Sequence, residues 1–389
     1  FFTLNKNKKT TLVSYTRYQS KILFMSEKKL LLEVKNLITE FHTEEGIVRA
    51  INDISFNIYR GETVGIVGES GSGKSVTSLS IMRLIPIPPG KIAGGEIIYH
   101  TKDGRQVNLL EIEEDEMRTF RGNDISMIFQ EPMTSLNPVF TCGDQVAEAI
   151  ILHQKVSKER AKEITIEMFE KVQLPTPDRI FSAYPHQLSG GQKQRVMIAM
   201  AMSCDPDILI ADEPTTALDV TVQKTILELM NDLKDELDSS VIFITHDLGV
   251  IGEIADRVIV MYRGNIVETG NVIDIFKDPK HPYTRSLLAC RPPLGKRLSK
   301  LPTVADFMQE DEDGNIKELS TSVEEAISKF TVSDAQTKER FAKLEATKPI
   351  LEVRNLKTWF PTKTNFFGKP TEYVKAVNDV SFDVYEGET

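Results

Sequence analysis

Several runs of apolar residues along the chain predict buried β-strands. The sequences "DILIAD" (residues 207–212) and "SVIFITHD" (residues 240–247) are continuously apolar until polar residues follow at their ends. Strands that are buried on both faces of a parallel sheet have this pattern, and functional side chains gather beyond the carboxyl ends of such strands. We therefore expect a parallel sheet that carries its chemistry along one edge.

The other patterns complete an α/β arrangement. Residues 31–56 alternate short β-rich runs with turns, and residues 62–85 have the pattern of a strand, a Gly-rich loop and a helix. Residues 144–202 are mostly helical, with breaks at prolines. Residues 257–270 predict a β-hairpin that turns at Arg263, Gly264 and Asn265.

One part of this pattern occurs twice. "LEVKNL" and "INDISFNIYRGET" begin at residues 32 and 51, and "LEVRNL" and "VNDVSFDVYEGET" begin at residues 351 and 377. A repeat period above 300 residues indicates a duplicated domain rather than a solenoid. Between the copies, residues 306–345 hold eleven acids against five bases, so we expect an acidic linker over 296–349 with a loose helix at 322–345.

Length and composition restrict the class of protein. A chain of 389 residues is too long for a single hydrophobic core, so we expect more than one domain. Its net charge of −10 disfavours a nucleic-acid partner. Its three cysteines lack metal-ligand spacing, and no apolar run approaches the ~20 residues of a membrane-spanning helix. Residues 1–24 carry five bases and no acid before Met25; we expect untranslated upstream sequence, with a transit peptide as the alternative.

The sequence "GESGSGKS" (residues 68–75) matches the phosphate-binding pattern G-x-x-x-x-G-K-[ST]. Its glycines allow backbone N–H groups to surround phosphates, and the following helix points its positive end at the anion. Lys74 adds a positive charge, and the Ser75 hydroxyl is suited to bind Mg²⁺. The expected phosphate-binding residues are Gly68, Ser70, Gly71, Ser72, Gly73, Lys74, Ser75 and Val76.

The sequence "ILIADEP" supplies two carboxylates at a strand end. We expect Asp212 to bind Mg²⁺ through a water molecule. We expect Glu213 to polarise the water that attacks the terminal phosphate, as a general base. The alternative is that Asp212 and Glu213 only cap the start of a helix. The complete phosphate loop upstream favours the catalytic interpretation instead.

"LSGGQ" (residues 188–192) is the motif that separates this chain from other phosphate-loop proteins. With it, the chain resembles the ATP-binding subunit of an ABC transporter over residues 31–295. The resemblance implies a P-loop NTPase (RecA-like) core with an antiparallel β subdomain and a helical subdomain near 135–205, together forming an ATPase domain at 25–295. It also implies ATP and Mg²⁺ as cofactors, and ATP hydrolysis coupled to transport.

The resemblance assigns further roles residue by residue. Gln130 matches the glutamine that contacts Mg²⁺ and senses the membrane partner, and His246 matches the histidine that contacts the γ-phosphate. Asp219, in "TTALD", matches the residue that reaches the opposite ATPase domain, and Phe41 matches the aromatic residue that stacks on adenine. The signature residues expected to contact ATP held by the other ATPase domain are Ser189, Gly190, Gly191 and Gln192.

Three longer stretches resemble the oligopeptide, dipeptide and nickel import group: "QEPMTSLNPVFTCGDQV", the region around "LSGGQ", and "HPYTRSLLACRPP" (residues 281–293). This implies two transmembrane permease subunits and, indirectly, an extracytoplasmic solute-binding protein, at the cytoplasmic face of the bacterial inner membrane. Peptides are the expected cargo; a nickel chelate, glutathione and a non-import role are alternatives. DNA-repair and translation relatives fit less well, because Cys-x-x-Cys insertions and a basic linker are missing from the sequence.

The second copy reaches "GET" at residues 387–389, the point where the first copy continues into its phosphate loop. We therefore expect residues 350–389 to begin a second ATPase domain that is truncated here, within a longer chain that has two such domains. The partner of the first ATPase domain would then be that second domain, or another copy of this chain for the fragment.

Overall fold

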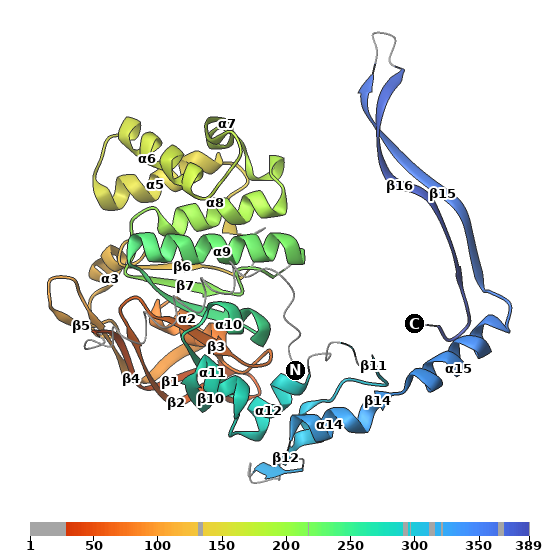
Figure 1. Ribbon diagram of the computed structural model, residues 1–389. Helices are drawn as coiled ribbons and strands as arrows, with labels where there is room; N and C mark the ends of the chain where they lie inside the picture. The colour runs from red at the N-terminus through yellow and green to blue at the C-terminus, as the bar shows by residue number, and fades with distance from the viewer. Residues whose placement is uncertain are drawn as a thin grey trace, which may run out of the picture. The chain divides into compact units, whose positions relative to one another are not determined.

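The computed structural model of the protein describes residues 29–130, 135–216, 218–290, 295, 297–310, 316–319, 322–364 and 369–388. Contacts within the chain separate two units, Phe1–Leu288 and Ala289–Thr389, and each is described by itself (Figure 1). The expectation that residues 1–24 are upstream sequence falls outside the described residues and stays a prediction.

A six-stranded sheet forms the centre of the first unit, in the strand order β10-β9-β3-β8-β7-β6. All neighbouring pairs are parallel except β9 and β10, which form the expected hairpin. Every residue of β3, β7 and β8 is buried, which explains their continuously apolar sequences. The strands are β3 (Thr63–Val67), β6 (Ile125–Ile128), β7 (Ile208–Asp212), β8 (Ser240–Thr245), β9 (Arg257–Tyr262) and β10 (Asn265–Asn271).

Helices flank this sheet, and the longest shows how local sequence sets a boundary. Helix α9 begins after Asp219, whose carboxylate accepts hydrogen bonds from the backbone N–H groups of Thr221 and Val222. It ends at Asp238, which adopts a left-handed conformation. The helices are α2 (Lys74–Ile81), α3 (Glu114–Phe120), α9 (Val220–Leu237), α10 (Leu248–Ile254), α11 (Val272–Lys277) and α12 (Pro282–Ala289).

A second sheet of four antiparallel strands, in the order β2-β1-β4-β5, is the antiparallel β subdomain. A single hydrophobic cluster contains Val34 and Tyr99 from this sheet together with Ile66 and Ile210 from the central sheet. The two sheets therefore share one core, which holds the subdomain in place. Its strands are β1 (Leu30–Thr43), β2 (Gly46–Tyr59), β4 (Gly90–His100) and β5 (Gln106–Asn108).

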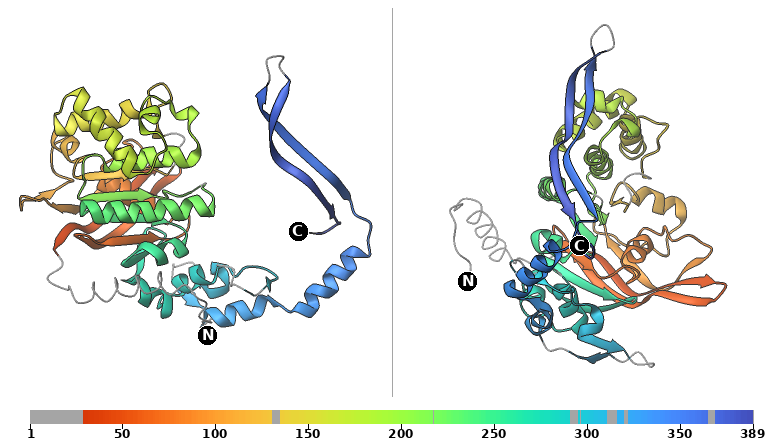
Figure 2. Two further views of the ribbon diagram at one scale, coloured as in Figure 1. Left: turned by 45° about the horizontal axis from the view of Figure 1, so that its top comes forward. Right: turned by 90° about the vertical axis from the view of Figure 1, so that its right-hand side faces the viewer.

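The helical subdomain lies at one end of the first unit, where Figures 1 and 2 show its yellow and green helices grouped together. Side-chain oxygens of Thr141, Ser157 and Ser189 cap three of its helices. Its helices are α5 (Cys142–Gln154), α6 (Lys158–Lys171), α7 (Pro177–Phe181), the short 3₁₀ helix η1 (Pro185–Gln187) and α8 (Gly190–Met202). The predicted fold class, an α/β core with these two subdomains, is confirmed.

The second unit contains short elements in the segment that we expected to be a linker. Two capped helices, α14 and α15, occupy the range of the expected loose helix, and a two-residue strand separates them. The elements are β11 (Arg297–Leu298), α13 (Val304–Phe307), β12 (Met308–Glu310), β13 (Ile316–Glu318), α14 (Val323–Phe330), β14 (Thr331–Val332) and α15 (Asp334–Glu345).

The hairpin of β15 (Leu351–Thr364) and β16 (Pro370–Val384) repeats the geometry of β1 and β2. Asn36 and Asn355 both adopt a positive φ, at 48° and 50°. Each donates its backbone N–H to a serine hydroxyl on the opposite strand at 2.8 Å. The paired residues correspond as well: Leu32–Ile58 and Val34–Phe56 in the first hairpin, Leu351–Val384 and Val353–Phe382 in the second. The repeat is thus visible in the backbone, and the second ATPase domain stays a prediction.

Candidate active site

The phosphate loop joins the end of β3 to the start of α2. Gly68 and Gly73 have positive φ values of 157° and 101°. A Cβ atom on Gly68 would lie 2.3 Å from the Met261 carbonyl oxygen, and one on Gly73 would lie 2.6 Å from that of Ala50. Glycine is therefore required at both positions, because the backbone of neighbouring strands leaves no space for a side chain.

Lys74 and Ser72 lie inside this loop. The Lys74 ammonium donates hydrogen bonds to the carbonyl oxygens of Gly68 and Glu69, each at 2.8 Å. Burial lowers the pKa of Lys74, and the nearby carboxylates of Glu213 and Asp212 oppose that shift. The buried Ser72 hydroxyl has no hydrogen-bond partner among the described residues. An anion with several oxygens, such as a phosphate chain, fits these donors.

Asp212 and Ser75 supply oxygen atoms next to the phosphate loop. The Ser75 hydroxyl donates to a carboxylate oxygen of Asp212 at 3.1 Å. Burial raises the pKa of Asp212, and the charge of Glu213 adds to this effect. Within the described parts of the chain, no cluster of three or more His, Cys, Asp or Glu side chains could hold a metal ion. The pair instead fits Mg²⁺, which commonly takes one or two protein ligands together with phosphate oxygens and water.

Three polar side chains surround Glu213, directly after β7. The His246 Nδ1 atom lies 3.1 Å from one carboxylate oxygen. The Thr216 hydroxyl and the Gln130 amide donate to the other oxygen at 2.9 and 3.3 Å. Glu213 has a positive φ of 47°, and its N–H donates to the Ile244 carbonyl at 2.9 Å. A rare backbone conformation held in this way is typical of functional positions.

The surroundings keep Glu213 ionised. Burial raises its pKa, but the hydrogen bonds from His246 and Thr216 and the charge of Lys74 lower it, and the net result is a pKa below the ordinary value. Glu213 is thus a carboxylate at neutral pH, able to accept a proton. The sequence pattern identified Glu213 and the family resemblance added Gln130 and His246, but neither gave a role to Thr216, whose place in "DEPTT" was the available signal.

The carboxyl ends of four neighbouring strands bring these residues together. Gln130 follows β6, Gly68 follows β3, Glu213 follows β7, and His246 follows β8. The four strands are consecutive in the parallel part of the sheet, in the order β3-β8-β7-β6. Parallel strands place their carboxyl ends at one edge, so side chains as far apart in the sequence as Ser75 and Asp212, which are separated by 137 positions, meet there.

The signature residues and Asp219 lie outside this hydrogen-bonded group. Ser189 and Gln192 form a reciprocal capping pair at the start of α8. Gly190 and Gly191 occupy the first helical turn, whose N–H groups have no partner within a helix. Asp219 caps α9, and a Cβ on Gly191 would lie 3.1 Å from Val222 in the first turn of that helix. The two helix starts are therefore neighbours.

Phe41 lies at the end of β1, paired with Val48 on one side and Gly90 on the other. It is half-buried, and a Cβ on Gly90 would lie 3.2 Å from its ring. The Val48 side chain is exposed. Part of the Phe41 side chain is therefore accessible, as base stacking requires.

Among the residues that the structure describes, no helix is both long enough and apolar enough to cross a bilayer.

Solved structures share this architecture. The chain superimposes on a dimeric post-hydrolysis state of the ATP-binding cassette MJ0796 bound to ADP and Pi, with a TM-score of 0.55, 30% sequence identity and coverage of 62% of this chain and 99% of that one. The chain belongs to the ABC transporter family. The family model of that name matches residues 51–216, and the model for the oligopeptide/dipeptide transporter C-terminal region matches residues 267–315.

Curated relatives within the ABC transporter family are longer than this chain. The glutathione import ATP-binding protein GsiA of Salmonella choleraesuis is 48% identical over 360 residues, which cover 92% of this chain and 55% of that protein. GsiA of Pectobacterium atrosepticum is 46% identical over 365 residues, which cover 94% of this chain and 56% of that protein. The chain therefore spans about half the length of the curated relatives that it matches.

Proposed function

We propose that this ABC cassette binds ATP with Mg²⁺ and hydrolyses it to drive the import of a peptide-class solute. The single observation that carries the proposal is that Lys74 in the phosphate loop, the Ser75–Asp212 pair and the Glu213–His246 pair lie together at one edge of the sheet. It combines a cation for phosphate, oxygen ligands for a divalent cation, and an ionised carboxylate.

Each residue of this group has a distinct role in the proposal. The loop N–H groups and Lys74 hold the phosphates, and Phe41 stacks on the base. Ser75, Gln130 and Asp212 hold Mg²⁺, which supplies charge neutralisation when bound. Glu213 accepts a proton from the attacking water. His246 orients the carboxylate through the 3.1 Å contact.

A complete site requires a second cassette in this proposal. The first turn of α8 presents N–H groups and the positive end of a helix, which attract the terminal phosphate of ATP held elsewhere. The relative MJ0796 is a dimer in its post-hydrolysis state. Two copies of this chain, or a second cassette in a longer chain, would bring each signature against the opposite phosphate loop.

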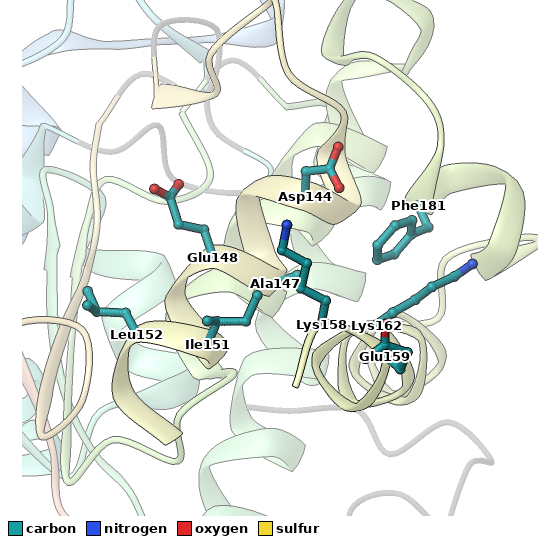
Figure 3. Close-up of a pocket in the computed structure, with 9 residues that line it drawn as sticks. All are labelled: Asp144, Ala147, Glu148, Ile151, Leu152, Lys158, Glu159, Lys162 and Phe181. Carbon is teal, nitrogen blue, oxygen red and sulfur yellow. The ribbon is translucent and has the colours of Figure 1, made fainter. Parts of the chain in front are cut away.

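The helical subdomain offers a place for the permease to dock. A pocket of about 580 Å³ opens between α5, α6 and the end of α7 (Figure 3). Ala147, Ile151 and Phe181 form its apolar lining, and the charged Glu148 and Lys162 lie around it. An amphipathic helix of a membrane subunit fits such a surface. The stretch "QEPMTSLNPVFTCGDQV" (residues 130–146), which includes the exposed Phe140, belongs to the same proposed docking surface; its residues 131–134 lie outside the described residues.

The cargo is proposed at the level of peptides. The oligopeptide/dipeptide match at residues 267–315 supports this class, and the glutathione import relatives support glutathione, itself a tripeptide, as the specific solute. We place the chain at the cytoplasmic face of the inner membrane, where permeases of this class receive their ATPase subunits. Nickel chelates remain the alternative cargo, which uptake assays distinguish.

The deciding experiment measures ATP binding and phosphate release by the purified chain. Lys74→Ala removes the loop cation, and we expect the Kd for ATP to rise at least tenfold, the order of a lost charged hydrogen bond. Lys224→Ala, an exposed lysine on α9, is the matched control and should leave the Kd unchanged. Equal affinity of Lys74→Ala and wild type would refute the proposed phosphate site.

The transport part needs the permeases. Vesicles that contain this chain with the permeases should take up glutathione or dipeptides only when ATP is present on the chain's side. Uptake of a nickel chelate in preference to both peptides would transfer the function to the alternative.

A further inference from the structure

Helix α12 is fixed at its start by a carboxylate from the neighbouring hairpin. The two Glu268 oxygens accept hydrogen bonds from the backbone N–H groups of Lys280 at 2.7 Å and His281 at 3.0 Å. These residues directly precede α12, which begins at Pro282. The sequence "HPYTRS" therefore folds into a helix start whose orientation is set by β10.

The third residue of that sequence, Tyr283, is completely buried. Its ring lies 4.5 Å from the ring of Tyr262 at the end of β9, measured between centroids. Its hydroxyl oxygen accepts a hydrogen bond from the backbone N–H of Glu69 at 2.8 Å. Glu69 is the second residue of the phosphate loop, so a side chain 214 positions away contacts the loop backbone.

Glu69 is thereby held from two sides. Tyr283 binds its N–H group, and the Lys74 ammonium binds its carbonyl oxygen at 2.8 Å. Both contacts restrict the same stretch of loop backbone, which must keep its conformation to surround a phosphate. A loop that is ordered before binding loses less conformational entropy when the ligand arrives.

We propose that Tyr283 is a positioning residue for the phosphate loop, and that the C-terminal segment beginning at residue 267 contributes to nucleotide affinity through this hydroxyl. The effect on nucleotide affinity rests on the proposed ATP site, whereas the contact between Tyr283 and Glu69 can be tested without nucleotide. Tyr283 does not touch the nucleotide in this proposal; it acts through Glu69.

The ring and the hydroxyl of Tyr283 have separable roles. Tyr283→Phe keeps the packing against Tyr262 and removes the hydroxyl that accepts the hydrogen bond from the Glu69 N–H group. Thr284→Val is a matched control, because Thr284 is also buried on α12 and its hydroxyl has no hydrogen-bond partner among the described residues. A general loss of stability from changing this helix would affect both variants, whereas loss of the Glu69 contact affects Tyr283→Phe alone.

The experiment combines amide hydrogen exchange without nucleotide and ATP binding by the full chain. We expect the Glu69 amide of Tyr283→Phe to exchange about 2- to 10-fold faster than in wild type, the range that one hydrogen bond corresponds to. The Kd for ATP and the KM should rise by a similar factor, with kcat within twofold. Thr284→Val should match wild type in every measurement.

Two outcomes would overturn the inference. One is an unchanged exchange rate and Kd in Tyr283→Phe while wild type binds ATP. The other applies even if the variant does not fold: a Glu69 amide in wild type that exchanges as fast as that of Gly71. Failure of wild type to bind ATP, with the Glu69 amide protected, would instead refute the proposed function and leave the contact established.

Discussion

Replacing Glu213 by glutamine should separate catalysis from ATP binding, because it removes the carboxylate with little change in shape. The side chain keeps its length and one carbonyl oxygen, which can still face His246 Nδ1. The other oxygen becomes an NH₂ group. That group can donate to the Thr216 hydroxyl. It cannot accept the hydrogen bond from the Gln130 amide, because both groups are then donors.

The expected magnitudes differ between folding and reaction. One weak hydrogen bond at 3.3 Å is lost, so the free energy of unfolding should fall by about 0.5–1.5 kcal/mol. Removing the general base should lower turnover by roughly 10²–10⁴-fold. That is about 2.7–5.4 kcal/mol in activation free energy, at 1.36 kcal/mol per factor of ten. ATP affinity should hold or increase, because a negative charge near the phosphates is removed.

The assay is phosphate release under single-turnover conditions, with ATP binding measured on the same preparation. Glu228→Gln makes the same chemical change at an exposed position of α9 and should behave as wild type. Turnover of Glu213→Gln within threefold of wild type would refute the general-base role. Lost ATP binding with normal folding would show that Glu213 supports the nucleotide rather than the water.

The remaining predictions concern the partner surfaces and a buried thiol. Phe140→Asp, at an exposed apolar position before α5, should abolish coupled transport while basal ATPase stays within twofold; lost ATP binding would contradict the docking surface. Turnover per molecule should rise with protein concentration, because the signature completes a site on another cassette, and constant turnover from a proven monomer would refute this pairing. Burial raises the pKa of Cys142 to about 11, so little thiolate exists at pH 8. Iodoacetamide should therefore label it more than about 100-fold slower than a peptide thiol, with the rate rising as pH increases towards that pKa; rapid labelling would contradict its burial.

Local sequence was sufficient wherever a structure depends on neighbouring residues. Eight consecutive residues encode the phosphate loop, because the glycines at its bends and the helix that starts at Lys74 are contained within them. The buried strands β7 and β8 were visible as apolar runs, since strands covered on both faces exclude polar side chains. The parallel order of these strands also explains why motifs at their ends predicted one site.

Asp219 shows where a motif and the fold assign different work to one residue. The resemblance gave it a contact with the opposite cassette, which stays a prediction. Within this chain, one of its carboxylate oxygens caps α9. An aspartate before a helix is a common N-cap, so the local pattern contained this role as well.

Only the tertiary structure decided which distant groups meet. The tyrosine of "HPYTRS" was present in the sequence, but its spacing of 214 residues from Glu69 carries no periodic signal. The hydrogen bond forms because β9 and β10 place α12 beside the end of β3. Two residues so far apart in the sequence come together only when the whole core packs. Hydrophobic periodicity indicates which face of an element is buried, but it does not indicate which polar atom lies opposite that face. The phosphate loop could therefore be predicted from the sequence, whereas its contact with α12 could not.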